Sequence, residues 1–79
     1  MKAHPKTLVA QLPADNDTLL TPASLAALLG LSVRGLERWR QDGRGPAIVR
    51  LSHRAIRYRA GAVRMWLAEQ ERRAAEGRR

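Results

Sequence analysis

Arginine dominates residues 29–45, which read LGLSVRGLERWRQDGRG. The charged side chains of this stretch are four arginines and two acids: Arg34, Glu37, Arg38, Arg40, Asp42 and Arg44. A solvated helix usually alternates its charge signs, because opposite charges four residues apart stabilise each other. An excess of guanidinium groups in a helix-forming stretch instead indicates a polyanionic partner.

The sequence lacks the residues of most other site chemistries. It has no cysteine, and its two histidines, His4 and His53, are far apart and have no cluster of carboxylates around them. Such a chain offers no thiol or disulfide chemistry and no usual set of metal ligands. We therefore expect no catalytic residues, no metal and no cofactor, and the protein is not predicted to be an enzyme.

The overall charge agrees with a polyanionic partner. The net charge is +8, which favours a nucleic acid, an acidic membrane or an acidic protein as the partner. No apolar run approaches the roughly 20 residues of a spanning helix, and the N-terminus lacks the apolar segment of a signal peptide. With 79 residues, the chain is expected to form one small soluble domain in the cytoplasm.

Two short helices are predicted before and within the arginine-rich stretch. Thr21 can cap the first helix, and Pro22 suits its first turn because the missing N–H would have no partner there. Gly30 is expected to end this helix in a left-handed conformation. Ser32 then caps a second helix, which runs from Val33 to about residue 42. Two short helices joined by a tight turn with glycine form a helix-turn-helix.

The second helix has an apolar face and a basic face. A rotation of about 100° per residue divides it into a core face with Val33, Leu36 and Trp39 and an opposite face with Arg34, Arg38 and Gln41. The basic face is either a solvated surface or a surface that reads DNA. The short leading helix, the tight turn and the arginine excess together favour DNA.

A β-hairpin is predicted after Gly43, Gly45 and Pro46, in the segment AIVRLSHRAIRYR (residues 47–59). Its apolar side chains alternate as in half-buried strands around a turn at residues 52–54. The side chains expected to face the core are Val49, Leu51, Ile56 and Tyr58. The basic side chains expected on the other face, at the tip and at the exit are Arg50, His53, Arg54, Arg57 and Arg59. A basic hairpin that follows a helix-turn-helix is a wing.

A third helix is predicted from about Gly61, with Val63, Trp66 and Leu67 on its apolar side. Trp66 is expected to pack against the first two helices and the hairpin. Residues 69–79 lack an apolar stripe and are predicted to form a basic C-terminal helical extension or tail.

The chain ahead of the first helix is not expected to belong to the folded domain. Residues 1–18 contain two prolines and no long apolar pattern, so they are predicted to be a flexible N-terminal arm. The folded domain is expected to span residues 19–68.

Three segments, LTPASLAALLGLSVRGLERWR, GRGPAIVRLSHRAIRYR and AVRMWL, together resemble a known family. Their order over residues 19–68 is similar to the MerR-like winged-helix domain of small excisionases, which are recombination directionality factors, and of AlpA-like phage regulators. The resemblance implies a mainly α fold with a small β-hairpin, namely three helices plus a wing. It also implies that the second helix enters a major groove of DNA, while the tip around His53 and Arg54 reaches an adjacent minor groove.

Two places depart from the family pattern. Gly35 stands where relatives often carry threonine or serine, which removes a possible hydrogen bond to DNA but allows a closer approach of the backbone. Ala62 and Arg64 stand where acidic residues are common, which makes the start of the third helix more basic. With these two residues, the third helix could also bind phosphates or an acidic neighbouring protein.

The candidate DNA contacts form two sets. The recognition-helix set is Ser32, Arg34, Gly35, Glu37, Arg38 and Gln41, and the phosphate and wing set is Arg40, Arg44, Arg50, His53, Arg54, Arg57 and Arg59. Arg34 and Arg38 are assigned to base edges, because a guanidinium fork can bind guanine O6 and N7 together. Gln41 suits adenine. Glu37 either accepts a hydrogen bond from a cytosine amino group or orients Arg34 or Arg40.

The sequence favours an excisionase that binds repeated sites in attachment-region DNA, bends this DNA and promotes excision by a site-specific integrase. A single small winged helix buries little surface, so specificity should come from several protomers on double-stranded DNA or from the integrase. We expect a monomer in solution that binds DNA cooperatively, head to tail. The alternative is an AlpA-like transcriptional regulator of a phage or mobile-element promoter.

Two other classes of partner fit the sequence less well. An RNA-binding protein would need exposed aromatic side chains for base stacking, whereas Trp39, Tyr58 and Trp66 all fall on core positions. A membrane-surface protein would need an uncovered apolar helix face, and here the apolar faces are required for the core.

Overall fold

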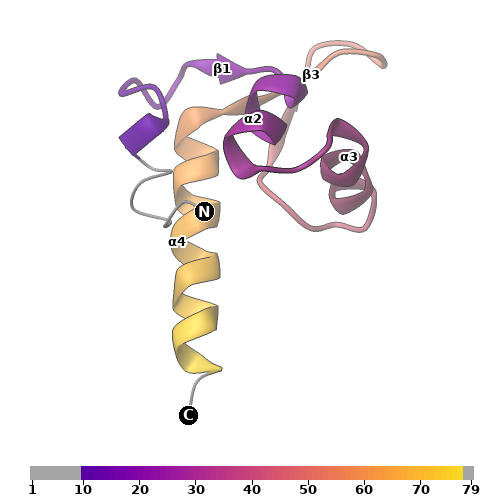
Figure 1. Cartoon of the computed structure of the whole chain (residues 1–79). Coiled ribbons are helices and arrows are strands. Elements are labelled where there is room, and N and C mark those ends of the chain that lie inside the picture. Colours follow the sequence, from indigo (N-terminus) through magenta and orange to yellow (C-terminus); the bar gives the residue numbers. More distant parts are fainter. Residues whose placement is uncertain (1–9, 78–79) are drawn as a thin grey trace.

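Three helices and a small sheet make up the described part of the chain, residues 10–77, in a computed structural model (Figure 1). The elements follow in the order β1 (Leu19–Leu20), α2 (Pro22–Leu29), α3 (Val33–Gln41), β2 (Ile48–Arg50), β3 (Ile56–Arg59) and α4 (Ala60–Glu76). This architecture confirms the predicted winged helix-turn-helix, in which β2, β3 and their connecting turn form the wing (residues 48–59). Within the described residues, no helix combines the length and apolar character needed to span a membrane.

The connection between α2 and α3 agrees with the sequence. The Thr21 hydroxyl accepts a hydrogen bond from the Ser24 N–H at 3.0 Å, and the Ser32 hydroxyl accepts one from the Gly35 N–H at 2.9 Å. Between the helices, Gly30 has a φ of 73°, a left-handed conformation that glycine adopts without a steric penalty. Local interactions therefore fix both the end of α2 and the start of α3.

The sheet has one strand more than the predicted hairpin. β3 lies in its centre and pairs antiparallel with β2 on one side and with β1 on the other. Leu20 of β1 lies opposite Tyr58 and packs against the core. β1 contains only two residues and pairs with a strand far along the chain, so neither its length nor its local pattern marks it in the sequence.

The register of the wing corrects the predicted faces of β2. The opposed pairs are Ile48 with Tyr58, Val49 with Arg57 and Arg50 with Ile56. Opposed side chains share a face of a sheet, so Ile48 faces the core. The core prediction for Val49 and Leu51 is therefore wrong by one residue, and Leu51 is 55% exposed. Arg50 and Arg57 lie on opposite faces instead of on the same one.

The core lies where α2, α3, the sheet and α4 meet. Its buried side chains are Leu12, Leu25, Ala26, Leu36, Tyr58, Val63 and Leu67. Trp39 and Trp66 pack against this cluster, with ring centroids 5.7 Å apart, a separation typical of favourable aromatic pairs. Val33 is 45% exposed, which contradicts its predicted place in the core. It lies in the first turn of α3, beside the wing.

Residues 10–18 form a strap across the start of α4. The Ala60 N–H donates to the Thr18 carbonyl at 2.9 Å, and the Gly61 N–H donates to the Asn16 carbonyl at 3.0 Å. The first N–H groups of a helix have no partner within the helix, and the strap satisfies two of them. These backbone hydrogen bonds attach the strap to α4.

Side chains hold the strap as well. Arg64 of α4 donates to the Pro13 carbonyl at 2.6 Å and also contacts the Asn16 side chain, while Arg59 pairs with Asp17 at 2.9 Å. The prediction of a flexible arm is therefore wrong for residues 10–18, because contacts from distant parts of the chain hold this strap against the domain. The first nine residues of that arm lie outside the described residues.

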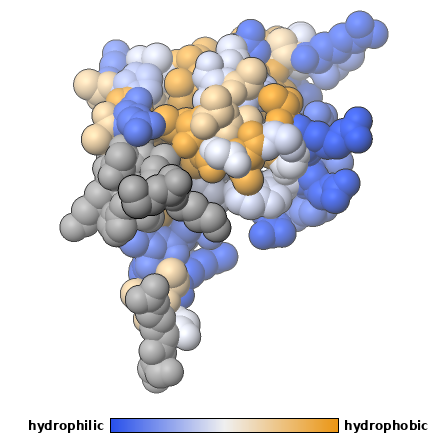
Figure 2. Space-filling view, in the orientation of Figure 1, coloured by the Kyte–Doolittle hydropathy of each residue, from blue (hydrophilic) through white to orange (hydrophobic). Residues whose placement is uncertain are grey.

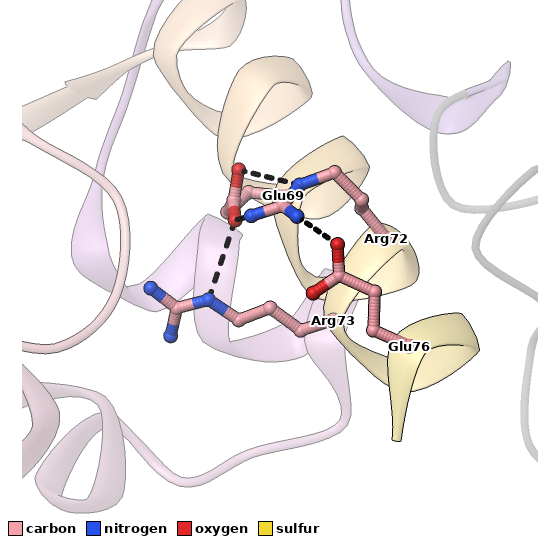
Figure 3. A network of polar contacts seen from close by, with 4 residues as sticks. All are labelled: Glu69, Arg72, Arg73 and Glu76. Atoms are coloured by element: carbon pink, nitrogen blue, oxygen red, sulfur yellow. Dashed lines mark hydrogen bonds and ion pairs between the residues drawn. The ribbon is translucent and has the colours of Figure 1, made fainter. Parts of the chain in front are cut away.

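The second half of α4 projects away from the rest of the domain (Figure 1). Its exposed turns carry an ion-pair network in which Arg72 contacts Glu69 and Glu76, and Arg73 Nε donates to Glu69 Oε2 at 3.3 Å (Figure 3). The hydrogen bond from Arg72 lowers the pKa of the Glu69 carboxyl. Pairs three or four residues apart support a helix, so the predicted C-terminal extension is helical as far as Glu76.

Candidate nucleic-acid interface

One face of α3 presents polar side chains to solvent. The exposed residues are Arg34, Glu37, Arg38 and Gln41, as the sequence predicts. On the opposite side of the helix, Leu36 is buried in the core and holds α3 in place. Within the described residues, no ion pair engages Arg34 or Arg38. Both guanidinium groups are thus available to an external acceptor.

The start of α3 leaves little room beside its cap. The Ser32 hydroxyl accepts the hydrogen bond from the Gly35 N–H, and a Cβ on residue 35 would lie 3.2 Å from that oxygen. The glycine therefore avoids crowding within the chain itself. The Ser32 hydroxyl can still donate its own hydrogen to a phosphate, because a hydroxyl is both donor and acceptor.

Arg40 lies on the side of α3 that faces the wing. Its Nη2 donates to Glu37 Oε1 at 3.2 Å, so Glu37 orients Arg40, which is one of its two predicted roles. The Arg40 side chain is 24% exposed, and its Nε has no hydrogen-bond partner within the described residues. Burial raises the pKa of the nearby Tyr58 phenol, and the positive charge of Arg40 opposes that shift.

The wing carries cations on the turn between β2 and β3. The Leu51 N–H donates to the Ala55 carbonyl at 2.8 Å. The Arg54 N–H donates to the Ser52 hydroxyl at 3.3 Å. The exposed cationic or titratable side chains of this region are Arg50, His53 and Arg54. Figure 1 shows that the turn extends beyond the body of the domain, so hydrogen bonds give a defined shape to a projecting, basic tip.

A hollow of about 370 Å³ lies between α3 and the wing. The basic side chains that line it are Arg40, Arg50, His53, Arg54 and Arg57, whereas Glu37 is the acid of its lining. Arg57 folds back to donate to the Ile56 carbonyl at 2.7 Å. Pro22 and Val33 also line the hollow, although neither is among the site residues predicted from the sequence. Their position results from packing and has no local sequence signal.

Two arginines of the predicted phosphate set lie away from the hollow. Arg59 pairs with Asp17 of the strap at 2.9 Å. Arg44 lies over the ring of Trp39, 5.4 Å from the ring centroid, and lines a separate hollow together with Arg73 of α4. Arg44 remains exposed and can still reach a phosphate, but Arg59 is engaged by the strap.

Positive charge is concentrated on α3 and the wing. Residues 32–59 carry eight arginines and two acids, which accounts for six of the eight net positive charges. Figure 2 shows hydrophilic side chains along the side of the domain where α3 and the wing tip lie. Across residues 10–77, no cluster of three or more His, Asp or Glu side chains is arranged to hold a metal ion. The surface therefore suits a polyanion.

The comparison with known protein families agrees with this geometry. A family model described as a helix-turn-helix domain matches residues 19–71, which is more than half of the chain. The matched range contains β1, α2, α3, the wing and the first part of α4. No curated protein and no solved structure matches the chain.

Proposed function

This chain belongs to the family of helix-turn-helix domains, which bind DNA, and we propose that α3 and the wing hold double-stranded DNA from two adjacent grooves. A major groove is wide enough for α3. The wing would then enter the neighbouring minor groove. The cationic hollow is the observation that carries this proposal, because the phosphate strand between two adjacent grooves would pass between α3 and the wing.

Within this arrangement the candidate residues have three roles. Base edges in the major groove are assigned to Arg34, Arg38 and Gln41, which are exposed on α3. Phosphates are assigned to Arg40, Arg44, Arg50 and Arg57, which would set position and affinity more than sequence preference. The minor groove is assigned to His53 and Arg54 at the wing tip, where a narrow groove attracts cations.

Salt dependence tests whether this surface binds phosphates. If the four phosphate-bound arginines and the arginines in the two grooves together neutralise about six phosphates, the logarithm of the binding constant should fall with the logarithm of salt concentration at a slope of roughly −5. Between roughly 50 and 200 mM salt, the affinity for duplex DNA should therefore fall by about a thousandfold. Fluorescence anisotropy with a labelled duplex measures this slope. A slope near zero would contradict the phosphate assignments.

We further propose that the protein is an excisionase, a recombination directionality factor that bends attachment-region DNA for an integrase. The resemblance over residues 19–68 supports this role, and so does the size of the interface, since α3 and one wing cover only a few base pairs. Several protomers would have to bind side by side. A head-to-tail contact between neighbours need not close into a ring, so a row of protomers can follow and curve the DNA.

DNA bending tests the excisionase proposal. Bending a site of 20–30 base pairs costs on the order of 1–6 kcal/mol, so several protomers should share this cost and bind cooperatively. We expect sedimentation to show a monomer without DNA, and circular-permutation gels to show a bend on DNA with repeated sites. A preformed dimer that binds a single palindrome without bending it would instead favour a transcriptional regulator.

One feature of the structure favours that second candidate, an AlpA-like regulator. The second half of α4 projects from the domain as a helix, and Met65, in the first half of the same helix beside the strap, is 76% exposed. An exposed helix with an apolar side chain can serve as a contact between two copies of a chain. A two-fold dimer formed through α4 would place two copies of α3 on symmetric half-sites, as at many promoters.

A further inference from the structure

Leu51 is a large apolar side chain at the base of the basic wing tip, and it is 55% exposed. On the strands of the wing, Ile48 and Ile56 pack against the core, whereas Leu51, which follows the end of β2, does not belong to that cluster. Its backbone is held by the hydrogen bond to the Ala55 carbonyl. Single exposed apolar side chains are common in proteins, so the surroundings of Leu51 decide its meaning.

The surroundings of Leu51 are cationic. Arg50 precedes it, and His53 and Arg54 follow in the same turn, all of them exposed. An apolar protein surface that covered Leu51 would also take these groups out of water without supplying anions, which is unfavourable. DNA offers phosphates to the cations and the apolar faces of sugars and bases to the leucine. The tip is therefore better suited to DNA than to an apolar protein partner.

We propose that Leu51 is a wedge that inserts at a base step in the minor groove and bends the DNA there. The proposal rests on the proposed placement of the wing in a minor groove. Apolar side chains that enter between base pairs partly unstack them and kink the duplex towards the major groove. The bend would thus begin within each protomer, before neighbouring protomers add to it.

The wedge also makes Leu51 a residue that determines specificity. Pyrimidine–purine steps unstack most easily, so the sequence under the wing should favour such a step independently of any hydrogen bonds to its bases. The defined shape of the turn supports this role, because a side chain on an ordered backbone loses less conformational entropy when it inserts.

Local unstacking can be measured directly with the full chain. The probe is a duplex of about 30 base pairs, selected from a random-sequence pool for binding to the protein, in which single adenines are replaced by 2-aminopurine. The fluorescence of this base increases when it unstacks. We expect an increase at one step under the wing with the wild-type protein. Energy transfer between dyes on the two duplex ends reports the bend.

Variants of two exposed leucines show whether unstacking and bending depend on Leu51 itself or on any exposed leucine of the sheet region. Leu51→Ala should abolish the fluorescence increase and most of the bend, and should weaken binding roughly tenfold through lost apolar contact. Leu51→Met keeps a long apolar side chain and should retain both signals. Leu19→Ala is the matched control, because Leu19 is 42% exposed in β1 of the same sheet. This control should behave as the wild type.

The outcomes distinguish the wedge from the proposed function. If Leu51→Ala binds DNA and keeps the fluorescence increase and the bend, the wedge is wrong but the DNA-binding proposal stands. The same holds if the wild type binds the selected duplex without unstacking any step. If the wild type binds no duplex at low salt, both proposals are wrong. Thermal unfolding should show equal stability of Leu51→Ala and the wild type, because the side chain lies outside the core.

Discussion

The arginines of this domain occupy two different environments. Around β1 and α4 they pair within the chain: Arg59 with Asp17, Arg64 with the strap, and Arg72 and Arg73 with Glu69. On α3, Arg40 pairs with Glu37, but no ion pair within the described residues engages Arg34, Arg38, Arg50 or Arg54 of α3 and the wing. The same residue type therefore consolidates the fold on one side and remains available to a partner on the other.

This difference shows that total charge alone does not locate a binding surface. Exposed ion pairs contribute only about 0–1 kcal/mol each to stability, so the strap depends mainly on its backbone hydrogen bonds and on the burial of Leu12. The unpaired arginines add little to the fold, because no ion pair holds them within residues 10–77. Substitutions on the two sides should consequently affect different measurements, DNA affinity on one side and stability on the other.

The largest effect on the DNA side is expected from Arg38→Ala. The loss of a base contact should weaken binding to the specific site by about 1–3 kcal/mol, and binding to random duplex much less. Arg50→Ala, which removes a cation from the lining of the hollow, should weaken both by similar factors, because phosphates carry no sequence information. Anisotropy titrations with the specific and the random duplex give, for each variant, the ratio of specific to non-specific affinity.

The comparison of Arg38→Ala with Arg50→Ala tests whether α3 reads the bases while the wing holds the phosphates. Equal ratios of specific to non-specific affinity in the two variants would show that α3 and the wing are not divided between readout and positioning. Neither variant should lower the unfolding temperature, since both side chains are exposed.

On the strap side, the largest effect is expected from Gly61→Ala. A Cβ at this position would lie 2.9 Å from the Asn16 Cβ, so the strap must move, and its hydrogen bonds to α4 would be strained. Crowding of this kind should lower the free energy of unfolding by about 1–2 kcal/mol, although alanine is the better helix former. Urea denaturation measures this change.

Gly77→Ala is the matched control at the other end of α4. The nearest atom to its new Cβ would be the Arg73 carbonyl oxygen at 3.5 Å, an ordinary contact, so stability should change little. The affinity of folded Gly61→Ala for DNA should equal that of the wild type. A loss of DNA affinity without a loss of stability would place the strap in the DNA interface.

The parts of the fold that the sequence predicts correctly are held by local interactions. The cap at Thr21, the left-handed Gly30 and the cap at Ser32 each depend on atoms within a few residues. Helical geometry then places Arg34, Arg38 and Gln41 correctly on the exposed face of α3, but it wrongly places Val33 on the core face. Of the recognition-helix candidates, Ser32, Arg34, Glu37, Arg38 and Gln41 are exposed, whereas Gly35 is half-buried.

The incorrect predictions concern contacts between distant residues. The run IVRL is compatible with either strand face, and the pairing of Ile48 with Tyr58 decides between them. β1 and the strap depend on partners in β3 and α4, so a local pattern does not reveal them. For the same reason, the sequence suggests Arg40 and Arg57 as separate phosphate contacts but does not show that both line one hollow.

The smallest effect should come from Arg59→Ala. This variant tests most directly whether arginines that pair within the chain differ in function from unpaired ones. The sequence predicts that both Arg59 and Arg54 contact DNA from the wing, yet Arg59 pairs with Asp17 of the strap. Its replacement should change stability by less than about 1 kcal/mol, as for other exposed ion pairs. It should leave the salt dependence of DNA binding unchanged, whereas Arg54→Ala should reduce the slope by about one. Equal losses of slope in both variants would mean that the pair with Asp17 opens on DNA, and pairing within the chain would then not distinguish structural arginines from binding ones.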